Sequence, residues 1–189
     1  MINYITIMKK LLLLVVMLIP VAVCAQENNE NKLTKYEEFI SKSGMVLKFE
    51  DIKFSPIPTY GVILPTRIRV IRGNPDIYFL GVTKSEDSFY TYSSSTLAMI
   101  EYSDLVEINK ALDKLRSEQE ADKEKKTDYL LNAFVTPDGF RVGYYIKKKS
   151  PQWFIELGRF DKTTSIDKPE PMIDIFKQAQ AKIEELKKE

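Results

Sequence analysis

Two runs of strand-like sequence, each followed by an amphipathic helix, constrain the fold of this chain most. The first run covers residues 45–101 and the second covers residues 129–157, and in both of them apolar and polar side chains alternate. Repeated alternation of single strands with helices, which would predict a parallel doubly wound sheet, is absent. The sequence therefore predicts an α+β fold: a mainly antiparallel, strongly bent sheet with two amphipathic helices packed on one face and a short N-terminal helix.

Three segments carry helix signals. Thr34 and Glu37 form a capping box ahead of a short helix from Lys35 to about Lys42. A longer helix begins near Ser103, and a final helix opens at Pro171. The apolar stripe of the longer helix consists of Leu105, Ile108, Leu112 and Leu115. The stripe of the final helix consists of Met172, Phe176, Ala179, Ile183 and Leu186.

The second strand run contains the clearest hairpin in the sequence. Pro137, Asp138 and Gly139 predict a turn between strands at Tyr129–Thr136 and Phe140–Lys147. The charged stretch 116–127 is interpreted as a solvated helix end followed by a loop. The first run is expected to include strands at 66–72, 77–83, 88–93 and 96–101, with an extra residue near position 51 that forms a bulge or a tight bend.

The N-terminus has the layout of a secretory signal peptide. Lys9 and Lys10 precede the apolar run Leu11–Ile19, and a proline and several small residues follow. The apolar run is shorter than the ~20 residues that a membrane-spanning helix needs. We expect cleavage after Ala25, with no transmembrane segment left in the mature protein.

This cleavage divides the chain into a signal peptide (1–25), a polar disordered spacer (26–32) and a single α+β domain (33–189). Cys24 offers an alternative, in which it becomes a lipid-modified N-terminus. Val23 suits a lipidation site poorly, so the soluble form is favoured over a lipoprotein. The protein is therefore predicted to be exported, either to the periplasm or out of the cell.

The composition excludes several kinds of chemistry. The chain has no histidine and one cysteine. Catalysis by imidazole or thiolate, His/Cys zinc sites, haem ligation and iron–sulfur clusters are therefore ruled out for the mature protein. We expect no cofactor and no metal. A net charge of +1 with mixed signs argues against a nucleic-acid partner, whose binding depends on a basic surface.

Two residue pairs are candidate ligand-binding residues. Tyr90 and Tyr92 share one strand face beside a run of hydroxyl residues, and they could stack a sugar ring or clamp a peptide. Arg67 and Arg69 share one strand face and could bind a carboxylate or sulfate. The alternatives are that the tyrosines lie in the core and that the arginines only protect a sheet edge.

A third candidate is the lysine run 147–149, which could touch an anionic membrane surface together with Trp153. The alternative interpretation is a solvated turn.

The segment Ile100–Leu115, which reads IEYSDLVEINKALDKL, lies between a Tyr/Ser-rich strand and an acidic stretch. It resembles a segment of small exported bacterial proteins of unknown function, and the likeness extends to the strands that follow. The resemblance implies an α+β fold and export. It carries no activity, substrate or site residue.

These observations predict a non-enzymatic binding or interaction module of the cell envelope. Its ligand would be an envelope protein, a peptide or a glycan, and no catalytic residue is nominated. The alternative is a small hydrolase or lyase that uses carboxylate and tyrosine side chains. The oligomeric state is left open by the sequence.

Overall fold

The computed structural model describes residues 32–42, 44, 46–86 and 94–188, and Thr34–Glu189 form one compact unit. The elements are α2 (Lys35–Ile40), β1 (Lys48–Pro58), β2 (Ile63–Arg72), β3 (Ile77–Glu86), β4 (Ser94–Glu101), α3 (Tyr102–Lys123), β5 (Tyr129–Val135), β6 (Arg141–Lys147), β7 (Ser150–Glu156), β8 (Thr164–Ile166) and α4 (Pro169–Leu186). The expected signal peptide with Cys24, almost all of the spacer, and the expected strand at 88–93 lie outside the described residues.

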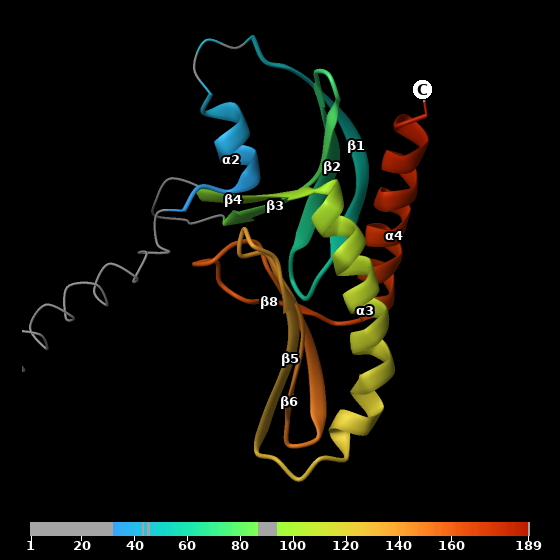
Figure 1. Cartoon of the computed structure of the whole chain (residues 1–189). Helices are drawn as coiled ribbons and strands as arrows, with labels where there is room; N and C mark the ends of the chain where they lie inside the picture. Colours follow the sequence, from blue (N-terminus) through green and yellow to red (C-terminus); the bar gives the residue numbers. More distant parts are fainter. Residues whose placement is uncertain (1–31, 43, 45, 87–93, 189) are drawn as a thin grey trace, which may run out of the picture. The chain divides into compact units, whose positions relative to one another are not determined.

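The strands form two four-stranded antiparallel sheets (Figure 1). Sheet A has the order β1-β2-β3-β4 and sheet B has the order β5-β6-β7-β8. The α+β class and the antiparallel pairing predicted from the sequence are confirmed. The strands divide between two sheets because α3 lies between β4 and β5 in the chain. A helix of 22 residues is about 33 Å long and carries the chain away from β4 before β5 begins.

One hydrophobic core serves both sheets. Helix α3 contacts β3 and β4 of sheet A and β5, β6 and β7 of sheet B, and α4 packs against α3 and β1 (Figure 1). The predicted stripe of α3 is confirmed, since Leu105, Ile108 and Leu112 are 0% exposed and Leu115 is 4% exposed. The stripe of α4 is buried as well, apart from its last residue, which is partly buried.

Helix α2 covers part of the face of sheet A that lies opposite the core shared with α3 and α4. Its predicted capping box is present, with Thr34 and Glu37 each accepting a hydrogen bond from the other's backbone amide. Tyr36 and Phe39 pack on a second, smaller cluster that includes Phe79. The ring of Tyr36 meets that of Phe79 edge to face, with centroids 5.4 Å apart. The short helix therefore closes one end of this face of the sheet.

Several details differ from the sequence expectations, including the first residue of α4, which is Pro169 rather than Pro171. The irregularity in β1 lies between Phe54 and Ile57 rather than near Asp51. Helix α3 continues to Lys123, so most of the charged stretch is helical. The three-residue strand β8 was not predicted, because a polar TSI segment has no apolar period. The backbone amide of Tyr60, between β1 and β2, donates to the carbonyl of Ser165 in β8 (3.0 Å) and so ties the two sheets together.

Candidate functional site

Strand β5 is an edge of sheet B, and its sequence YLLNAFV contains no charge, no proline and no glycine. Edge strands in natural proteins normally carry such residues, because an unprotected row of backbone amides and carbonyls pairs with other chains. On the outward face of β5, Tyr129 is 57% exposed, and Leu131 and Val135 are each 49% exposed. This edge is thus apolar as well as unprotected.

The inward face of β5 is also incompletely covered. Leu130 and Phe134 point toward the core but are only partly buried, whereas Val142 and Ile146 on the neighbouring strand β6 are buried. Apolar side chains are therefore partly exposed on both faces of β5. Among the described elements, only β6 is hydrogen-bonded to β5 in the sheet.

Aromatic side chains extend the apolar surface from β5 across sheet B. Leu131 pairs with Tyr145 of β6 in the strand register. The ring of Tyr145 stacks on that of Tyr129, with centroids 6.0 Å apart, and lies 6.3 Å from the ring of Phe154 on β7. We call Tyr129, Leu131, Val135 and Tyr145 the β5 surface. Aromatic groups of this kind are enriched where proteins bind partners.

Hydrogen bonds to α3 hold β5 in place. The side-chain amide of Asn132 donates to Glu118 Oε2 (3.0 Å) and lies 3.2 Å from Asp122 Oδ2. The buried hydroxyl of Tyr144 donates to the same Asp122 oxygen (2.8 Å). Lys125 and Tyr144 lower the pKa of Asp122 through their hydrogen bonds, and burial together with Asp122 raises the pKa of Tyr144 to about 12. At neutral pH this cluster therefore keeps a carboxylate and a neutral hydroxyl, which fixes the backbone of β5.

A lysine turn lies beside the start of β5. Lys148 and Lys149 connect β6 to β7, and their φ angles are 52° and 62°. Two central residues with positive φ define a type I′ hairpin turn, which strongly prefers Asn-Gly. Lysine in this conformation is strained. Tyr129 pairs with Lys147, so the three exposed lysines 147–149 lie next to the first residue of the edge strand.

Arg69, a predicted ligand-binding residue, is 8% exposed and is engaged within the protein. Its Nε and Nη2 atoms donate to the two carboxylate oxygens of Asp51, both at 2.7 Å, and Nη1 donates to the hydroxyl of Tyr36. The ring of Phe49 lies 4.1 Å from the guanidinium carbon. Arg69 therefore holds β1, β2 and α2 together, and its hydrogen bonds to Asp51 lower the pKa of that carboxyl.

Arg67 lies on the same face, as predicted from its spacing. Its side chain crosses Gly81, where an added Cβ would be 3.1 Å from Arg67 Cγ. Its Nε is 3.6 Å from Asp51 Oδ2 and is buried without a hydrogen-bond partner. The structure thus brings both arginines to one carboxylate. Tyr90 and Tyr92 lie outside the described residues, so their proximity to the arginines stays a prediction.

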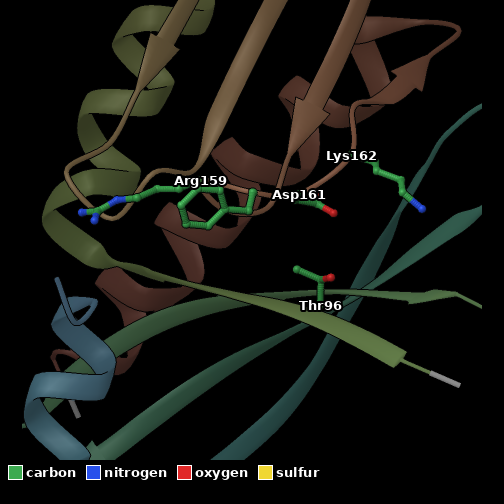
Figure 2. A pocket seen from close by; sticks show the side chains of 6 residues that line it. Thr96, Arg159, Asp161 and Lys162 are labelled. Carbon is green, nitrogen blue, oxygen red and sulfur yellow. The ribbon is translucent and has the colours of Figure 1, made fainter. Parts of the chain in front are cut away.

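A shallow hollow of about 410 Å³ lies between β4 and the loop that joins β7 to β8. Its lining residues are Thr96, Gly158, Arg159, Phe160, Asp161 and Lys162 (Figure 2). Asp161 forms a buried ion pair with Lys84 and also accepts a hydrogen bond from the amide of Leu157 (2.8 Å). Arg159 donates to the carbonyl of Pro137 (3.0 Å) and reaches away from Thr96 (Figure 2). Both oxygens of Asp161 are therefore used to position the loop.

The lysine run and Trp153, considered together in the sequence, do not share a surface. Trp153 is 3% exposed, and its indole Nε1 donates to Gln119 of α3 (2.7 Å). Within the ranges that the structure describes, no helix combines the length and apolar character that crossing a membrane requires. No cluster of potential metal ligands occurs among those same residues.

The sequence predicted a strand at β5 but not that its edge is a candidate site. The uninterrupted uncharged run from Tyr129 to Val135 was visible in the sequence. Such a run does not indicate the position of its strand in the sheet. In comparisons with known proteins, no family model, no curated protein and no solved structure matches the chain.

Proposed function

We propose that this protein is an exported binding module that holds an extended segment of a partner protein along β5. The observation that carries the proposal is the unprotected edge of sheet B, with apolar side chains partly exposed on both faces of the strand. An extended peptide added to such an edge gains backbone hydrogen bonds, and its alternate side chains contact the sheet surface. The signal-peptide pattern at residues 1–25 supports placing this module in the cell envelope.

The β5 surface would provide selectivity. Side chains of the added strand that point to the outward face would lie against Leu131 and Val135, with Tyr129 and Tyr145 at one end. Side chains on the inward face would cover Leu130 and Phe134, which the core covers only in part. A segment with apolar residues at both parities near its centre fits this arrangement best.

The described residues give less support to a hydrolase or lyase. A general acid or base works best when its pKa lies near the working pH. The pKa values of Asp51 and Asp122 are lowered by their hydrogen-bonding partners, and that of Tyr144 is raised to about 12. These shifts move the three pKa values away from neutrality, as is typical of structural hydrogen bonding. Burial raises the pKa of Asp138, but that carboxylate accepts a hydrogen bond from the backbone amide of Lys35 (3.1 Å).

The proposal is tested by affinity capture from envelope extracts with three baits: the mature protein, Leu131→Lys and Ile63→Lys. Both substitutions place a lysine at an exposed apolar position, but Ile63 lies on sheet A. We expect a protein to be retained by the mature protein and by Ile63→Lys, and to be lost with Leu131→Lys. Capture that is equal for all three baits, or absent for all three, would contradict the proposal.

A further inference from the structure

No partner among the described residues explains the lysine turn at 147–149. Lys147, Lys148 and Lys149 are exposed, and none of them has an ion pair within the part of the chain that the structure describes. Two of them also adopt positive φ, where lysine is strained and Asn-Gly would be relaxed. A strained, charged turn beside an unprotected edge is a reason to look for a ligand group there.

Further charged residues surround the start of β5. Exposed Lys126 adds a positive charge, whereas Glu124 and Asp128 on the same loop are negative. Lys123 and Lys125 are paired with Glu120 and Asp122 of α3, at 2.7 Å in each case. Lysines 147–149 and Lys126 outnumber Glu124 and Asp128, so this end of β5 keeps an excess of positive charge. An incoming strand that reached it would be favoured by negative charge.

The direction of an added strand follows from the sheets. All pairs of adjacent strands in the described structure are antiparallel. A strand that adds to β5 in antiparallel orientation runs from Val135 toward Tyr129. Its C-terminal end therefore lies beside the lysine turn. We propose, as an extension of the proposed function, that the partner segment is an extended apolar strand followed on its C-terminal side by acidic residues.

Two peptide libraries test this directly. Each peptide has six positions randomised among Val, Ile, Thr, Tyr, Phe and Ser, and three glutamates fixed at the C-terminal end in one library and at the N-terminal end in the other. Binding of each library to the mature protein is measured by fluorescence anisotropy at low salt. We expect the C-terminal acidic library to bind about tenfold more tightly, because several exposed ion pairs each contribute a modest factor. This preference should disappear at ~0.5 M salt, where charges are screened within a few ångströms.

Substitutions distinguish binding along the edge of β5 from attraction by the lysine turn. Lys148→Asn with Lys149→Gly keeps a type I′ turn and removes two of the positive charges, so it should reduce the preference for the C-terminal acidic library severalfold. Lys53→Gln with Lys168→Asn removes two exposed lysines elsewhere and should keep the preference. Leu131→Lys should lose binding of both libraries, because it charges the edge itself.

The outcomes distinguish the two proposals. Equal binding of both libraries, with loss in Leu131→Lys, would overturn the acidic preference and leave the edge-binding function standing. No binding of either library would overturn both. Sedimentation of the mature protein as a dimer that Leu131→Lys converts to a monomer would also overturn the proposal, because a second copy would then occupy the edge.

Discussion

Strands β1 and β5 are both edges, and they differ in almost every feature that controls pairing with other chains. β1 carries four charged residues, two prolines and a register shift, whereas β5 carries none of these. Salt bridges also tie β1 to its neighbour, with Asp51 bound to Arg69 and Glu50 bound to Arg72. Residues that discourage pairing with other chains are therefore present at the edge formed by β1 and missing from the edge formed by β5. Lack of protection at β5 is therefore informative about its use.

The largest expected effect comes from the core that both edges share. Leu112 is 0% exposed at the centre of α3, so Leu112→Ala should lower the free energy of unfolding by about 2–5 kcal/mol. Because α3 contacts both sheets, hydrogen exchange should accelerate at β1 and β5 together. Urea denaturation measures the first effect and amide exchange the second. Loss of protection at one sheet alone would show that the two sheets unfold separately.

A smaller effect of opposite sign is expected at the lysine turn. Lys148→Asn with Lys149→Gly should raise the free energy of unfolding by about 1–2 kcal/mol, because both positions have positive φ. Gly139→Ala provides the matched contrast, since Gly139 has a φ of 89° and an added Cβ would collide with Arg159. That variant should be destabilised in the same urea assay. A neutral or destabilising result for the double variant would show that the turn is not strained.

Adding a lysine to the edge formed by β5, or removing one from the edge formed by β1, should change self-association of the protein more than its free energy of unfolding. Leu131→Lys and Lys53→Val both alter exposed positions, so each should shift the free energy of unfolding by no more than about 0.5 kcal/mol. Light scattering at increasing concentration should show that Lys53→Val associates more than the unmodified protein, because β1 loses a gatekeeping charge. Unchanged scattering would indicate that the prolines alone protect β1.

The effect that is smallest near neutral pH is a pH dependence at Tyr144 of sheet B. Burial and the hydrogen bond to Asp122 raise the folded-state pKa of Tyr144 from 10.0 to about 12, so the folded state favours the neutral hydroxyl and this contribution is fully present below the unfolded pKa. This contribution is lost as pH rises through about 12. Trp153 is the one tryptophan in the chain, and its ring centroid is 5.2 Å from that of Tyr144. Its emission should change in this pH range before far-UV circular dichroism reports unfolding, and the early change should be absent in Tyr144→Phe.

Local patterns in the sequence predicted the fold class well. The capping box at Thr34 and the stripe through Leu112 are short-range signals, and both are confirmed. The pairing of strands was harder to predict from the sequence, because it depends on where α3 carries the chain before β5 begins at Tyr129. The edge position of β5 follows from that pairing and not from its own residues. The spacing of Arg67 and Arg69 correctly placed them on one face, but Asp51, their shared partner, comes from another strand.

Helix α3 has a mechanical consequence for any partner that pulls on β5. Asn132 is hydrogen-bonded to α3, and the same helix packs on β3 and β4. Tension along an added strand would load its backbone hydrogen bonds in shear, so that many must break together. The load would then pass through a single rigid helix into sheet A, bypassing the short loop at 124–128. If a segment binds along β5 as proposed, this arrangement would resist being pulled apart along the direction of that segment.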